Sequence, residues 1–116
     1  MRGGITVADN APVRQVDVRE CRNLKSVERT VLFALASAVA EGRHIVKITH
    51  GDKRVAQIRT FLRSLLRRGE IRLFIEGTKL GDDDDPGSLY LRANFGSETS
   101  DASFWERGPG VTVVCV

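Results

Sequence analysis

Hydrophobic positions change their spacing along the chain in a way that separates strands from helices. Val16 and Val18 alternate with polar neighbours, which is the two-residue period of a short strand. Between about Leu24 and Glu41 the apolar residues recur every three or four positions and predict a helix. Asn23 is suited to cap its start and Gly42 to end it. The second half of this helix is apolar nearly all round, so we expect deep burial or contacts on two sides.

The pattern repeats in the middle of the chain. Residues 44–49 (HIVKIT) are β-branched and mostly apolar, as in an interior strand. A second amphipathic helix is predicted from about Arg54 to Arg68, with Gly69 as its stop. Alternation over residues 70–76 and the β-prone stretch 111–116 predict two more strands.

These elements predict an α/β fold of the α+β two-layer sandwich type, in the order β-α-β-α-β-β. The sheet would be mixed and four-stranded, with its first two strands parallel and both helices on one face. Residues 1–13 are predicted to be a flexible arm, and residues 14–116 a single domain. An acidic loop is inserted at about 77–108, and within it residues 88–95 (SLYLRANF) are predicted to form an extra strand.

Composition narrows the class of protein. The 116 residues are 41% hydrophobic, enough for one core. No apolar run approaches the roughly 20 residues of a membrane span, so no membrane partner is expected. The first 15 residues lack an apolar signal core, and the two cysteines form neither a metal motif nor a disulfide framework. We therefore expect a cytoplasmic protein.

Charge is distributed unevenly. Residues 1–75 hold 15 Lys and Arg against 7 Asp and Glu, a net charge of +8, whereas residues 76–116 hold 3 against 8, a net charge of −5. A basic body indicates an anionic partner such as nucleic acid, and a solvated surface of mixed sign is the alternative.

Several polar residues follow the predicted strands. Asp17 and Arg19 lie at the end of the first strand, and His50 and Gly51 directly follow the second. The carboxyl ends of parallel strands and the starts of the following helices point the same way, and helix starts attract anions. The order therefore predicts one phosphate-sized site, completed by Lys53 and Arg54.

Each of these residues also has a structural interpretation. His50 could be a strand-end histidine bonded to backbone, and Asp17 could cap a turn or orient His50 or Arg19. Arg59, Arg63 and Arg67, spaced four residues apart, fit either a phosphate track or a solvated helix face. The four aspartates at 82–85 lack the ligand spacing of a calcium loop, so no metal site is predicted.

The motifs VDVR (16–19), THG (49–51) and GPGVTVV (108–114), in this order, resemble the Smr (small MutS-related) domain family. Asp17 matches the family's first motif, His50 and Gly51 match its His-Gly-x-Gly motif, and Gly108 and Gly110 lead into its last strand. The resemblance implies a sheet like that of the C-terminal domain of bacterial translation initiation factor three. It also implies binding of DNA or RNA, often with nicking or RNA-cleaving endonuclease activity, and no cofactor or firmly required metal.

The chain departs from the family pattern at two motif positions. Arg19 stands where the family has a histidine, and Lys53 stands at the second glycine of His-Gly-x-Gly. If that histidine transfers protons, arginine cannot replace it, whereas if it holds a phosphate, the arginine fork serves as well. We therefore expect a nucleic-acid-binding domain in which His50, Asp17 and Arg19 support at most weak cleavage. The alternative is a catalytically inactive module that contacts a protein through its acidic loop or its apolar first helix.

Overall fold

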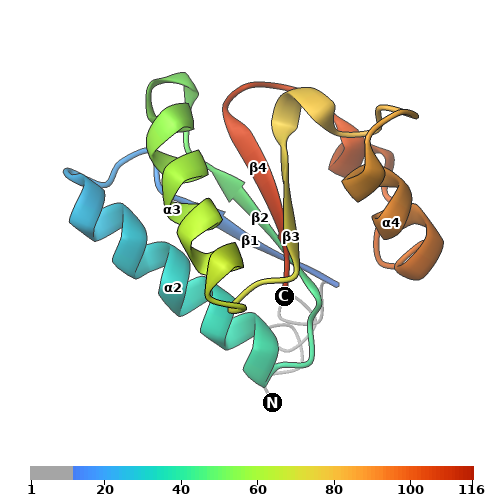
Figure 1. Ribbon diagram of the computed structural model, residues 1–116, viewed down its shortest axis with the longest axis horizontal. Coiled ribbons are helices and arrows are strands. Elements are labelled where there is room, and N and C mark those ends of the chain that lie inside the picture. Colours follow the sequence, from blue (N-terminus) through green and yellow to red (C-terminus); the bar gives the residue numbers. More distant parts are fainter. Residues whose placement is uncertain (1–11) are drawn as a thin grey trace, which may run out of the picture.

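A mixed four-stranded sheet forms the centre of the molecule in the computed structural model, which describes residues 12–116 (Figure 1). Its strands are β1 (Val13–Asp17), β2 (Ile45–Thr49), β3 (Leu73–Glu76) and β4 (Val111–Cys115), in the spatial order β1-β2-β4-β3. β1 and β2 are parallel, and β4 runs antiparallel to both β2 and β3. The predicted mixed sheet, with its first two strands parallel, is confirmed.

The predicted N-terminal arm falls mostly outside the part of the chain that the structure describes. Residues 1–11 are not described, and the arm cannot extend to residue 13 as predicted, because Val13 already pairs with Ile45 in the sheet.

Helices α2 (Leu24–Ala40) and α3 (Val55–Arg67) pack on the same face of the sheet, as predicted (Figure 1). The Asn23 side chain caps α2 by accepting a hydrogen bond from the Ser26 N–H at 2.8 Å. Gly42 and Gly69 follow the two helices with φ of 74° and 73°, which is a backbone conformation that favours glycine. One core joins the helices to the sheet and is made of Val18, Val27, Val31, Ala34, Leu35, Ala38, Val46, Ile48, Ile58, Leu62, Leu65, Ile71 and Val114.

The extra strand predicted for residues 88–95 is wrong, because this stretch belongs to a helix, α4 (Pro86–Asn94). The Asp85 carboxylate accepts a hydrogen bond from the Ser88 N–H at 2.8 Å, and Pro86 occupies the first turn, where its missing N–H costs nothing. Short 3₁₀ turns lie on either side of α4, at Gly77–Lys79 and Ala102–Trp105. The inserted segment therefore contains helical turns and, within the described residues, no strand.

The inserted segment covers the second face of the sheet, opposite α2 and α3 (Figure 1). Leu80, Leu91 and Phe104 pack there in a second apolar cluster with residues of β2, β3 and β4, namely Ile45, Ile75, Val113 and Cys115. α4 comes close to β3 at Gly87, where a Cβ would lie 2.7 Å from the Ile75 Cγ1 atom. The insertion thus anchors the sheet at its β3–β4 side and leaves the opposite face to α2 and α3.

The outer side of α2 is apolar and exposed. Phe33 is 68% exposed and Val39 62% exposed, and Leu32 lies beside them at 41%. The apolar second half of this helix therefore packs on the sheet with one side only, within the part of the chain that the structure describes. Among residues 12–116 no helix combines the length and the apolar character needed to cross a membrane.

Candidate nucleic-acid interface

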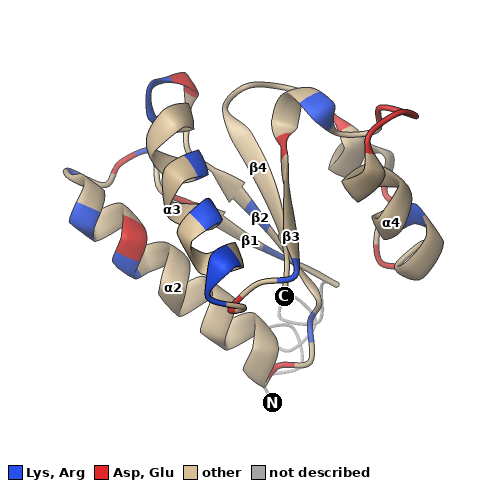
Figure 2. Cartoon of the chain, viewed as in Figure 1, with Lys and Arg blue, Asp and Glu red and all other residues tan. Residues whose placement is uncertain are grey.

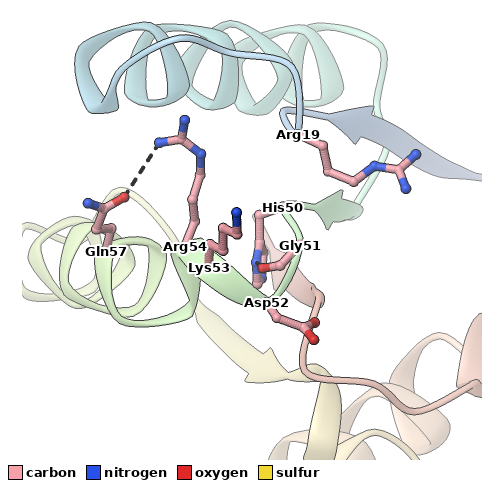
Figure 3. Close-up of a pocket in the computed structure, with 7 residues that line it drawn as sticks. All are labelled: Arg19, His50, Gly51, Asp52, Lys53, Arg54 and Gln57. Atoms are coloured by element: carbon pink, nitrogen blue, oxygen red, sulfur yellow. Dashed lines mark hydrogen bonds between the residues drawn. The ribbon is translucent and has the colours of Figure 1, made fainter.

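Three chain segments meet at one end of the sheet. The ends of β1 and β2 and the start of β4 lie in register, with Asp17 opposite Thr49 and Thr49 opposite Val111. Beyond them lies an open pocket of about 610 Å³, lined by Arg19, His50, Gly51, Asp52, Lys53, Arg54 and Gln57 (Figure 3). Of the predicted site residues, the pocket brings together Arg19, His50, Gly51, Lys53 and Arg54. The volume exceeds that of a single phosphate.

Asp17 does not line the pocket but holds Arg19. Its carboxylate accepts the Arg19 backbone N–H at 3.0 Å, and it receives the guanidinium through Nε at 3.0 Å and Nη2 at 2.7 Å. These side-chain and backbone hydrogen bonds lower the pKa of Asp17 to about 2. Both residues are exposed, so the pair sets the direction of Arg19 and adds little to stability. Two predicted roles of Asp17, capping a turn and orienting Arg19, are found together.

His50 is buried beneath the pocket, with 2% of its surface exposed. Its Nδ1 atom lies 2.8 Å from the carbonyl oxygen of Gly51, and its Nε2 atom lies 2.9 Å from the Thr112 hydroxyl on β4. Both ring nitrogens are thus engaged by the protein itself. The histidine ties the β2–α3 loop to the start of β4.

The Gly51 carbonyl determines which ring nitrogen of His50 carries the hydrogen. A carbonyl oxygen only accepts, so Nδ1 carries the hydrogen, and the neutral ring accepts the Thr112 hydroxyl at Nε2. Burial lowers the pKa of His50, while the backbone of Gly51 and Val111 acts in the opposite direction. The ring is therefore neutral at physiological pH, with no nitrogen free for a ligand.

Gly51 and Gly110 shape the contact between the loop after β2 and the start of β4. Gly51 has φ 78° and ψ 168°, a region that is essentially restricted to glycine. The Gly110 carbonyl accepts the N–H groups of His50 at 2.8 Å and Gly51 at 3.0 Å, and a Cβ on Gly110 would lie 3.2 Å from the Gly51 Cα. Gly108 donates its N–H to the Gly77 carbonyl at 3.2 Å. Gly51 therefore lines the pocket, whereas the predicted binding residues Gly108 and Gly110 lie outside its lining and hold the neighbouring loops through backbone hydrogen bonds.

Lys53 and Arg54 lie in the short 3₁₀ turn Asp52–Arg54 that leads into α3. Lys53 is exposed, and its place in this turn accommodates the Cβ that the family glycine lacks. Arg54 reaches across to the β1–α2 loop, where Nη2 donates to the Cys21 carbonyl at 2.6 Å. Figure 3 shows Lys53 between Arg54 and Arg19, whose guanidinium points away from the other two. The cations surround the pocket and do not converge on one point.

The three arginines of α3 that were predicted to contact phosphates, Arg59, Arg63 and Arg67, differ in their surroundings. Arg59 donates through Nε and Nη2 to Glu76 at the end of β3, at 3.1 and 2.7 Å. Arg63 and Arg67 are exposed on the following turns. Figure 2 shows Lys and Arg along α3 and the first turns of α2, whereas the acidic residues of the inserted segment lie on the other side of the molecule, around α4. Arg63 and Arg67 extend the basic surface, and Arg59 belongs to a half-buried ion pair.

Three residues with a part in this site escaped sequence reasoning. Asp52 and Gln57 line the pocket, and Thr112 holds His50 from 62 positions away. The position of Gln57, one turn after Arg54, was a signal that could have identified it. Within residues 12–116, no group of three or more His, Cys, Asp or Glu side chains is arranged to hold a metal ion.

One comparison with known proteins found a match, and it concerns the fold. The Smr domain of Thermus thermophilus MutS2, a solved structure, superposes with a TM-score of 0.54 at 26% sequence identity. The match covers 88% of this chain and 95% of that one. No family model and no curated protein matches the chain. The resemblance to the Smr domain predicted from the motifs is confirmed by this structural match.

Proposed function

We propose that this chain, which has the fold of an Smr domain, binds nucleic acid at the pocket beyond the ends of β1 and β2. The observation that carries the proposal is the set of cations around that pocket. Arg19, Lys53 and Arg54 line it, and Asp52 is the one carboxylate among the lining residues. With His50 neutral, the lining has a net charge of +2, which favours an anionic ligand.

The cations have different roles in this proposal. Lys53 is exposed and acts as a point charge for a phosphate. Arg19 is oriented by Asp17 and still has N–H groups directed to solvent, so it suits a second phosphate of the same strand. Arg54 already binds the Cys21 carbonyl, so it both contributes charge and holds the two loops together. Two separated phosphate contacts fit an open pocket of about 610 Å³ better than a single phosphate does.

We further propose that any endonuclease activity of the chain is weak. Cleavage requires groups that accept and donate protons, and one such group contributes a rate factor of about 10²–10⁴. The imidazole of His50 is 2% exposed, and both its nitrogens are occupied. Arg19, at the other motif position, stays charged and does not transfer protons near neutral pH. His50 thus supports the site by positioning its loop, and Asp17 does so by positioning Arg19.

Binding by variants tests the proposal. Fluorescence anisotropy with labelled single-stranded, duplex and branched DNA and RNA should show binding by the native chain at low salt. Lys53→Ala should weaken it more than Lys79→Ala, the matched control, because Lys79 is an exposed lysine in the 3₁₀ turn after β3. Equal losses from both variants would mean that only diffuse charge attracts the ligand, and the pocket would not be the binding site.

The protein-interaction module is the second candidate, and the exposed apolar side of α2 favours it. Large apolar residues exposed on one helix, such as Phe33 and Val39, are a feature of contact surfaces. The same anisotropy series distinguishes the candidates, because an interaction module shows no nucleic-acid binding at low salt. In that case Phe33→Glu, an exposed position away from the pocket, would be the variant that abolishes partner binding.

A further inference from the structure

A groove between α2 and α3 adjoins the basic pocket. It has a volume of about 500 Å³, within the range of about 300–1,000 Å³ typical of small-molecule sites. The lining combines apolar and polar side chains: Leu24, Glu28, Ala56, Gln57, Thr60, Phe61, Ser64 and Arg68. Leu24 is 37% exposed, and Phe61 is half-buried, so both present apolar surface to the groove.

Gln57 joins the groove to the basic pocket, because it lines both. The Arg54 guanidinium donates to its side-chain oxygen at 3.5 Å, and Figure 3 shows the two side chains linked at the start of α3. Phe61 lies four residues after Gln57 along α3, about one helical turn and a rise of about 6 Å. This rise along the helix is similar to the distance between the phosphate and the base of one nucleotide, so a nucleotide could contact both the basic pocket and Phe61.

The charges of the groove suit a neutral ring and not a second phosphate. Glu28 is the carboxylate of the lining and would repel an anion. Arg68, at the far end, already pairs with Glu70 at 3.2 Å. The amide of Gln57 and the hydroxyl groups of Thr60 and Ser64 can donate and accept hydrogen bonds, as a base edge requires. Phe61 adds an aromatic surface on which a base can stack.

We propose that the α2–α3 groove binds an unpaired nucleobase of the strand whose phosphate occupies the basic pocket; this inference rests on the proposed function. The substrate class that follows is single-stranded nucleic acid, or the loops, bulges and ends of structured molecules. A duplex must first unstack a base before the groove can receive it.

Abasic oligonucleotides separate the contribution of the base from that of the phosphate. Two labelled single strands of the same length, one of mixed sequence and one with abasic sites throughout, carry the same phosphates. The native chain should bind the mixed strand about tenfold more tightly, corresponding to about 1.4 kcal/mol for stacking. Ala56→Leu fills the groove at an exposed helical position, and it should remove this difference without changing affinity for the abasic strand. Phe61→Leu, which removes the ring but keeps an apolar side chain, should reduce the difference.

Ala36→Leu is the matched control, since Ala36 is an exposed alanine of α2 that lines a separate depression with Val39. It should preserve the tenfold preference. Equal affinity of the native chain for the two strands would overturn the base site, while leaving the proposed function intact if binding weakens with salt. An equal loss for both strands in Ala56→Leu would also overturn it. Absence of binding to either strand at low salt would overturn the proposed function itself.

Discussion

Replacement of His50 by alanine should destabilise the fold strongly, because the ring forms two internal hydrogen bonds. A typical hydrogen bond contributes about 0.5–1.5 kcal/mol, and a buried polar group left without a partner costs about 1–3 kcal/mol. The Thr112 hydroxyl, 4% exposed, and the Gly51 carbonyl would both lose their partner. We therefore expect His50→Ala to lower the free energy of unfolding by about 2–4 kcal/mol, a large share of the about 5–15 kcal/mol of a typical domain.

Equilibrium unfolding in urea measures this loss. Trp105 is the single tryptophan and donates its indole N–H to the Thr99 carbonyl at 2.9 Å, so its fluorescence reports on the native inserted segment. His44→Ala is the control, because His44 is an exposed histidine that stacks on Phe95 at 4.9 Å, and its loss should cost less than about 1 kcal/mol. A His50→Ala protein within about 0.5 kcal/mol of the native chain would refute the structural role of the imidazole.

Three further predictions concern the same end of the sheet. Since burial lowers the pKa of His50, the unfolded chain binds more protons than the native one, so stability should fall as pH drops below the unfolded value of 6.5. Urea unfolding between pH 7.5 and 5.5 measures this loss of stability. If the free energy of unfolding of His50→Ala fell with pH just as steeply, the pH dependence would belong to another group. Gly51→Ala should lower the free energy of unfolding by about 1–3 kcal/mol, because φ 78° with ψ 168° strains any residue other than glycine. An unchanged midpoint of urea unfolding would contradict that strain. Arg19→His should raise cleavage of a labelled single strand on a gel if a proton carrier is needed at this position, and an unchanged rate would exclude that requirement.

The periodic elements were predictable because each buries one face against the sheet. In α3, the buried residues Ile58, Leu62 and Leu65 recur every three or four positions, which is the spacing of an amphipathic helix. α4 was not predictable from its period, since its residues Pro86–Asn94 make few turns and include glycine, serine and asparagine. The sequence signal that was missed is Asp85 as a helix cap, followed by Pro86 at the first helical position.

The site was predictable in position but not in contacts. Strand order and helix starts brought Arg19, His50 and Lys53 to one end of the sheet, as the sequence predicted. The Nε2 atom of His50 is hydrogen-bonded to Thr112, and Arg59 is paired with Glu76. Both partners are distant in sequence, so no local pattern could reveal them. The catalytic and binding roles of these residues stay predictions.

The salt dependence of nucleic-acid binding tests the central claim most directly. Affinity of the native chain for a single-stranded oligonucleotide, measured by anisotropy from 25 to 200 mM salt in about five steps, should fall linearly on logarithmic axes as counterions are released. Lys53→Ala should reduce the magnitude of that slope by about 0.7, the value for one phosphate contact to a single strand, and Lys79→Ala should leave it unchanged. A native chain that shows no binding at the lowest salt, or a slope that Lys53→Ala does not change, would contradict the account.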